Sequence, residues 1–158
     1  MESAYADNPG VPRYFNSYAE RVVYNRLFAT DGERTVLIPD NLFYAHTELA
    51  DLLSQLKGAK AALPHLNAMV AYAPAYPFSH MKLAVQLARN EDWDSARAAC
   101  LNALRVALDR DDAAFAYYRL AYADAPLTVD VQRVRIVLFR RRGLYHERAH
   151  RTGADRGA

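Results

Sequence analysis

The sequence contains one cysteine, Cys100, among its 158 residues, and this scarcity excludes two kinds of structure. A single thiol cannot form an internal disulfide, and it cannot build a zinc site that needs several thiolates. Glycine is also scarce, with six residues, and none stands in a phosphate-binding loop; no serine stands in a GxSxG pattern. A reducing cytoplasm agrees with this cysteine usage, so we expect a cytoplasmic location.

Long apolar runs and a strong charge of one sign are absent as well. No uninterrupted apolar stretch approaches the roughly 20 residues that a membrane span needs. The amino terminus MESAYADNPG lacks the basic region and apolar run of a secretory signal. The 20 basic and 18 acidic residues leave a net charge of +2. We therefore expect no membrane partner, and no global field that favours nucleic acid.

A hydrophobic content of 52% is enough to build a continuous core. Within residues 77–108, apolar and small side chains recur at helical spacing in two runs, which are Met81, Leu83, Ala84 and Leu87, and then Trp93, Ala96, Cys100, Ala103 and Leu104. The all-polar segment 89–92 between the runs is long enough only to reverse the chain. Residues 77–108 therefore predict a helical hairpin, whose apolar face needs a neighbour to cover it.

A second hairpin is predicted over residues 41–74, because a shift of 34 residues superposes the two patterns. The positions that coincide are Leu49-Ala50 with Leu83-Ala84, Leu53 with Leu87, Ala62 with Ala96, and Leu66 with Cys100. Asp40 or Asn41 suits the N-cap of its first helix, and Gly58 suits the position after that helix ends. Pro64 leaves open where the return helix over residues 59–73 begins.

The segments before these hairpins are predicted from shorter patterns. Residues 1–11 are expected to form a loose leader, and residues 12–29 a helix that caps the open end of the stack. For residues 35–38 an extended strap and an edge strand both fit. We favour the strap, because no second strand pattern is present to pair with it.

A partial third repeat is predicted from residue 111, with a helix over residues 113–124. Asp111 and Asp112 suit the first turn of that helix, where carboxylates interact favourably with the helix dipole. The Leu120-Ala121 pair follows Leu83-Ala84 by 37 residues rather than 34, which predicts that the connection before the helix is about three residues longer.

These positions resemble the tetratricopeptide repeat family over about residues 43–123. The family's 34-residue unit has a Leu-Gly/Ala pair in its first helix and alanines in its second. The matching residues are Leu83-Ala84, Leu87, Trp93, Ala96, Ala103 and Leu104 in one unit, and Leu49-Ala50, Leu53, Ala62 and Pro74 in the other. The pattern departs from the family at His46, His80, Cys100 and Leu108, where Trp, Trp, Phe and Pro are usual. The resemblance implies an all-α fold of antiparallel helical hairpins stacked as a short right-handed α-solenoid.

In this family the first helix of each unit lines a concave groove. The resemblance therefore implies a peptide-binding groove lined by Tyr44, Thr47, Asp51, Phe78, Met81, Lys82, Val85, Phe115, Arg119 and Tyr122, with Glu48 and Tyr118 beside them. Aromatic rings and two cations suit an extended peptide or a helix with an acidic or carboxylate anchor. In the alternative interpretation, Phe78, Met81 and Phe115 pack between repeats and the charged groups are solvated. The Lys and Asn set that clamps a terminal carboxylate in some family members is not recognisable.

No constellation in the sequence predicts catalysis, a metal site or a cofactor. His46 and His80 lie one repeat apart, about 10 Å at ordinary helix-packing distances, and neither HExxH nor paired cysteines accompany them. We therefore interpret these two histidines and His65 as packing residues. Cys100 lies on the apolar stripe of its helix and is interpreted as a small core residue.

The resemblance stops at Asp124-Ala125-Pro126, which breaks the helix of the partial third repeat. Residues 124–158 carry eight arginines and four carboxylates, a net charge of +4. Two interpretations stay open: an added helix followed by a basic tail, or a foreign or out-of-frame carboxy terminus on a truncated repeat protein. This segment offers groups that suit a nucleic acid. Phosphates would contact Arg140, Arg141 and Arg142, and bases would stack on Phe139 and Tyr145.

The sequence thus predicts a non-catalytic protein–protein interaction module, a scaffold or adaptor that binds a peptide or helix in its groove. The alternative is a nucleic-acid-associated protein that uses the Arg-rich segment. A homodimer is a further partner hypothesis, because a stack of two full hairpins exposes an apolar end.

Overall fold

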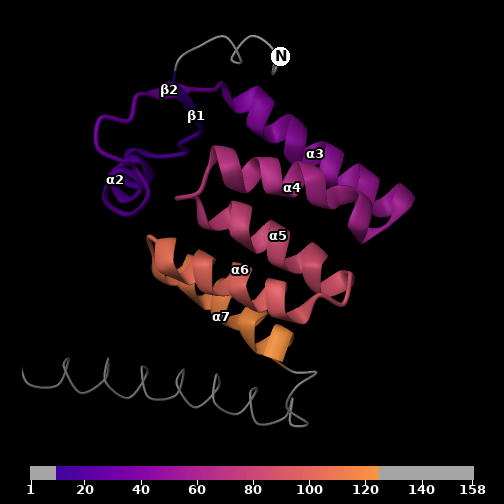
Figure 1. The fold of residues 1–158 in the computed structure, drawn as a ribbon. Helices are drawn as coiled ribbons and strands as arrows, with labels where there is room; N and C mark the ends of the chain where they lie inside the picture. Colours follow the sequence, from indigo (N-terminus) through magenta and orange to yellow (C-terminus); the bar gives the residue numbers. More distant parts are fainter. Residues whose placement is uncertain (1–9, 125–158) are drawn as a thin grey trace, which may run out of the picture. The chain divides into compact units, whose positions relative to one another are not determined.

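The computed structural model describes residues 10–124, and these residues fold mainly as α-helices (Figure 1). They form six helices and two short strands in the order β1, α2, β2, α3, α4, α5, α6, α7. The chain divides into two compact units between Ala123 and Asp124, and all described residues except Asp124 belong to the first. Within the described residues, no helix combines the length and apolarity needed to cross a membrane.

The first hairpin consists of α3 (Asp40–Lys57) and α4 (Ala59–Tyr72). A single residue, Gly58, separates the two helices with a φ of 88°, a left-handed conformation that glycine adopts without steric cost. The predicted role of Gly58 is therefore confirmed. The predicted N-cap is wrong, because Pro39 takes that position without a side-chain hydrogen bond and Asp40 is already in the first turn.

Pro64 lies inside α4, which begins five residues before it at Ala59. A proline there has no N–H for the carbonyl four residues earlier, so the helix forms despite the loss of one internal hydrogen bond. Tertiary packing compensates for this loss, since Ala62, Leu66 and Met69 of the same helix are buried in the core.

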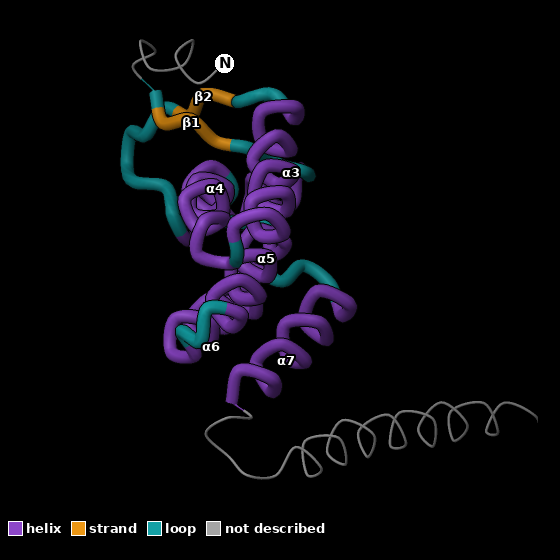
Figure 2. The backbone as a smooth tube through the Cα atoms, turned by 90° about the vertical axis from the view of Figure 1, so that its right-hand side faces the viewer, coloured by secondary structure: helices purple, strands orange, loops and turns teal. Residues whose placement is uncertain are grey.

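The second hairpin consists of α5 (Pro77–Arg89) and α6 (Trp93–Val106), within the predicted range of residues 77–108. Pro77 stands at the start of α5, where its missing N–H costs nothing. The Asp92 carboxylate accepts a hydrogen bond from the Ser95 N–H and caps α6. Helix α4 packs against α5, so the two hairpins are direct neighbours (Figures 1 and 2).

The repeat-matched alanines Ala50 and Ala84 are both buried, but the leucines before them differ. Leu83 packs against the core of each hairpin, whereas the side chain of Leu49 is 44% exposed. Leu52 and Leu56 of α3 are exposed as well. The outer side of α3 is therefore an uncovered apolar surface of the described residues.

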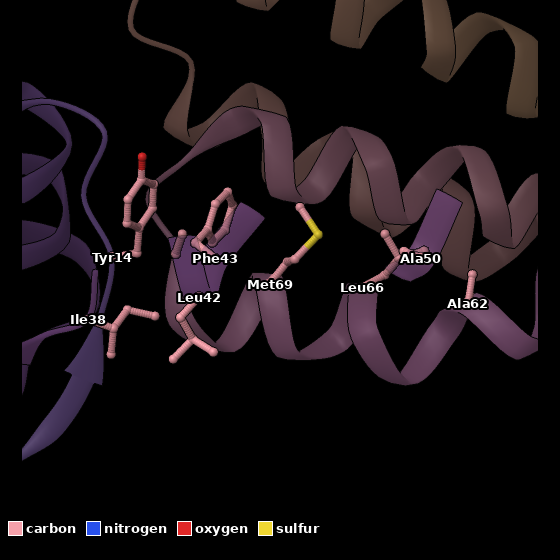
Figure 3. Close-up of a cluster of buried hydrophobic side chains, with 9 residues drawn as sticks. Tyr14, Ile38, Leu42, Phe43, Ala50, Ala62, Leu66 and Met69 are labelled. Atoms are coloured by element: carbon pink, nitrogen blue, oxygen red, sulfur yellow. The ribbon is translucent and has the colours of Figure 1, made fainter. Parts of the chain in front are cut away.

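The largest buried cluster joins the first hairpin to the N-terminal segment (Figure 3). Phe43 is fully buried, and the ring of Tyr14 stacks on it with 4.3 Å between centroids. Leu66 and Met69 of α4 continue the same cluster along the hairpin. The core therefore runs from the N-terminal strand into the space between α3 and α4.

The strap predicted over residues 35–38 is a strand, so our preference was wrong. Strand β2 (Thr35–Leu37) pairs in parallel with β1 (Val11–Arg13), with Val11 opposite Thr35. The N–H of Val11 donates to the Arg34 carbonyl at 2.8 Å, and the N–H of Ile38 donates to the Arg13 carbonyl at 3.0 Å. Three-residue strands are too short to show an alternating pattern, which is why the sequence did not reveal the partner.

The helix predicted over residues 12–29 is shorter, because β1 occupies its first residues. Helix α2 (Tyr18–Leu27) begins after Ser17, whose hydroxyl accepts the Glu20 N–H at 3.3 Å. The Glu20 carboxylate accepts the Asn16 N–H at 2.8 Å, and burial raises its pKa. Both hydrogen bonds fix the first turn of the helix.

Helix α2 lies across the ends of the other helices instead of over the outer side of α3 (Figure 1). The Arg13 guanidinium joins it to α4, donating to the Tyr24 hydroxyl at 2.8 Å and to the Ala71 carbonyl at 3.0 Å. At the end of α6, Arg105 lies over the ring of Phe28. The segment thus holds the carboxyl ends of α4 and α6 together.

Helix α7 (Arg110–Asp124) begins three residues earlier than predicted, and the connection before it is not lengthened. Residues 107–109 join α6 to α7, whereas residues 73–76 join α4 to α5. The Asp109 carboxylate accepts the N–H groups of Asp111 and Asp112 at 2.9 and 2.8 Å, so it caps the helix. Asp111 and Asp112 lie in the first turn, as predicted.

Candidate functional site

The candidate site follows helix α5, which has α3 on one side and α7 on the other. In Figure 2, α3 and α7 lie on the same side of the hairpins, α4 and α6 lie opposite, and α5 is between them. Ser54 of α3 donates a hydrogen bond to Gln86 of α5 at 2.9 Å. On the other flank, Met81 of α5 packs against Ala116 of α7. Three helices that are distant in sequence therefore contribute to one surface.

An ion pair joins α3 to α5 within this surface. The Lys82 ammonium lies 2.8 Å from Oδ1 and 2.6 Å from Oδ2 of Asp51, and it lies over the ring of Phe78 at 5.7 Å from the centroid. Both charged groups are only partly exposed. The sequence predicted Lys82 as a cation available to a ligand, but its charge is already matched by Asp51.

A cavity of about 300 Å³ lies between α5, α6 and α7. Six of the ten lining residues have small apolar side chains, and the other four are Arg89, Tyr118, Arg119 and Tyr122. Val85, Arg119 and Tyr122 are predicted groove residues that the structure brings together here. The other apolar lining residues are Ala84, Ala88, Ala96, Cys100 and Ala123.

Arg119 differs from Lys82 because its Nε is buried and has no hydrogen-bond partner. The guanidinium lies over the rings of Phe115 and Tyr118, at 5.0 and 5.6 Å from their centroids. Such cation–π contacts are favourable by about 0.5–1 kcal/mol each at exposed sites and so favour this position of the guanidinium. Phe115, also a predicted groove residue, therefore contributes by positioning Arg119 and is itself partly exposed.

Two of the predicted groove residues are packing residues instead. Thr47 is buried, and its hydroxyl lies 3.5 Å from the Phe43 carbonyl oxygen and from the sulfur of Met69. Met81 is buried against Ala103 and Ala116, as predicted by the alternative interpretation in which this residue packs between repeats. Neighbouring residues of a helix point about 100° apart. The sequence therefore does not determine whether a residue at the edge of the predicted face points into the core or towards solvent.

Several aromatic rings lie in contact near the start of α5, and among them the ring of Tyr44, on α3, is exposed. The other members are Tyr14, Phe43, Tyr76 and Phe78. The ring of Tyr44 meets Phe43 edge-on at 5.4 Å, and Phe78 lies 5.5 Å from Tyr76. Burial and the neighbouring phenol of Tyr44 raise the pKa of Tyr76 to about 12, so its hydroxyl stays protonated at neutral pH. Sequence reasoning missed Tyr76 because it lies in the connection between hairpins.

The histidines make separate contacts. His46 and His65 of the first hairpin face each other, with 3.1 Å between their Nδ1 atoms. The Nε2–H of His80 donates to the Pro74 carbonyl at 2.8 Å. Among residues 10–124, no group of three or more His, Cys, Asp or Glu side chains gathers as metal ligands would.

His80 predicts a pH dependence of stability. Burial lowers the pKa of His80, so the folded protein keeps it neutral while the unfolded chain binds a proton below about pH 6.5. Unfolding then takes up a proton, and we expect the free energy of unfolding to fall between pH 7 and pH 5, by at most about 1.4 kcal/mol per pH unit. His80→Gln keeps a donor for Pro74 without titrating, so urea unfolding of this variant should show a smaller decrease. An equal decrease in both proteins contradicts the assignment.

Comparisons with known proteins found no matching family model, no matching curated protein and no matching solved structure.

Proposed function

We propose that the chain is a non-catalytic polypeptide-binding module, with its hairpins arranged as in tetratricopeptide repeats and its ligand bound at the cavity between α5, α6 and α7. The observation that carries the proposal is the cavity between α5, α6 and α7, which combines small apolar side chains with two tyrosines and two arginines. Such a combination is typical of pockets that receive one anchoring side chain.

The repeat pattern also supports the proposal. Positions 34 residues apart, such as Ala50 and Ala84, are buried in successive hairpins that pack through α4 and α5. The first helices of the units, α3 and α5, are linked by Asp51 and Lys82. The alternative use of the Arg-rich segment in nucleic-acid binding concerns residues 124–158, almost all outside the described range, and stays a prediction. Homodimerisation likewise stays a prediction, and sedimentation at several concentrations would test it.

Two neighbouring tyrosines provide a matched test of the binding surface. Tyr117 and Tyr118 are 53% and 54% exposed, but only Tyr118 lines the cavity. Random twelve-residue peptides displayed on phage are selected on the full chain, and their affinities are measured by fluorescence anisotropy. We expect Tyr118→Ala to weaken binding roughly tenfold, as loss of an interface aromatic does, and Tyr117→Ala to leave it nearly unchanged. Equal effects, or failure to select any peptide, contradict the proposed function.

A further inference from the structure

We infer that the cavity beside Arg119 receives the side chain of a glutamate or aspartate in the bound polypeptide, an inference that rests on the proposed function. The anchor follows from three features of the cavity, which are the guanidinium of Arg119 in its lining, the balance of charge and the size and polarity of the walls.

The Nε–H of Arg119 is buried without a hydrogen-bond partner among the described residues. A guanidinium is always charged and carries only donors, and a buried donor without a partner is costly to the folded state. Among the described residues, one other buried side-chain atom, the hydroxyl of Ser79, is in this condition, and Ser79 does not line the cavity. This Nε–H has almost no exposed surface, so a ligand in the cavity meets the positive charge of the guanidinium and its other N–H groups.

The charges around the cavity favour an anion. Two of the lining residues, Arg89 and Arg119, are cations, and no carboxylate is among them. Tyr118 and Tyr122 also line the cavity, and a tyrosine hydroxyl is able to donate a hydrogen bond to an anion. Arginine binds a carboxylate through paired N–H groups more strongly than it binds a neutral acceptor.

The walls of the cavity favour an acidic side chain whose carboxylate is joined to the backbone by methylene groups. Alanines, Val85 and Cys100 supply the apolar lining, which suits the methylene groups between a carboxylate and its backbone. A volume of about 300 Å³ is at the lower limit of ligand sites, enough for one side chain. A phosphate group lacks the stem and would leave this apolar lining without contact.

The first test uses a probe that does not depend on any partner. N-acetylglutamate N-methylamide, its glutamine analogue and inorganic phosphate are titrated separately into the ¹⁵N-labelled full chain, and the Arg119 Nε–H resonance is followed by NMR. We expect a saturable shift with the glutamate compound and little shift with the glutamine analogue. Equal shifts with both analogues, or a larger shift with phosphate, overturn the inference.

The second test uses the selected peptides and an arginine pair on α7. We expect each peptide to contain an acidic residue whose replacement by the amide weakens binding tenfold or more, about the effect of losing a hydrogen bond to a charged group. Arg119→Gln should weaken binding similarly and abolish the sensitivity to that replacement, whereas Arg110→Gln, on the exposed first turn, should change neither. Circular dichroism verifies folding of both variants.

The outcomes separate the two hypotheses. Peptides that bind through Tyr118 but tolerate replacement of every acidic residue overturn the acidic anchor and leave the proposed function standing. A carboxylate shift at Arg119 without any selected peptide supports the anchor site and contradicts the polypeptide ligand.

Discussion

Phe43→Ala should lower the free energy of unfolding by about 3–5 kcal/mol, the range for truncation of a fully buried phenylalanine. The side chain of Phe43 is 0% exposed, and its ring contacts Tyr14, Tyr44 and Tyr76. The substitution therefore removes apolar contact in α3 and also the stacking that holds β1 to the first hairpin. Urea unfolding followed by circular dichroism measures the change.

Leu52→Ala provides the control for this prediction on the same helix. Leu52 is 51% exposed, so its truncation should change the free energy of unfolding by no more than about 0.5 kcal/mol. Similar losses in both variants would mean that the cluster around Phe43 is not the core that the structure describes.

Ala116→Asp should detach helix α7 from the hairpins. Ala116 is fully buried against Met81 and Ala103, and a carboxylate placed there would be buried without a partner, which typically costs several kcal/mol. Since α7 is the last described helix and packs on the hairpins through few large side chains, its 15 residues can separate while α3 to α6 stay folded. We expect a partial loss of helical signal and complete loss of peptide binding, because the cavity loses one wall.

Ala114→Asp is the matched control for α7. Ala114 is exposed and lies two residues before Ala116, so the same carboxylate there remains in water. This variant should keep both the helical signal and peptide binding. If Ala116→Asp also keeps peptide binding, α7 does not form part of the site.

The hairpins were predictable because the apolar stripes and the 34-residue shift report burial directly. Ala50 and Ala84 are equivalent in sequence and both are buried, and Gly58 ends α3 as its type suggests. The pairing of β1 with β2 was not predictable, since it joins residues 24 positions apart through backbone atoms alone. Leu120 packs against the cluster of Ala84, Ala99 and Cys100, but the spacing of 37 residues does not reflect a longer connection, because α7 already begins at Arg110.

The candidate site was predictable only in part. Val85, Arg119 and Tyr122, three of the residues predicted for a groove, line one cavity, but whether they bind a ligand stays a prediction. Sequence spacing does not show that Asp51 neutralises Lys82 or that the Nε of Arg119 is unpaired, because both depend on side-chain rotamers. For the same reason the sequence did not separate Thr47, which is buried, from the exposed residues beside it.

Site-specific photo-crosslinking tests most directly whether a polypeptide binds beside the cavity. The photoreactive residue p-benzoylphenylalanine replaces Tyr118 in one protein and Tyr117 in another, and each is irradiated with a selected peptide. The two positions have nearly equal exposure but point about 100° apart around α7. We predict a crosslinked product from position 118 and little or none from position 117; equal products, or a product from position 117 alone, would contradict this account.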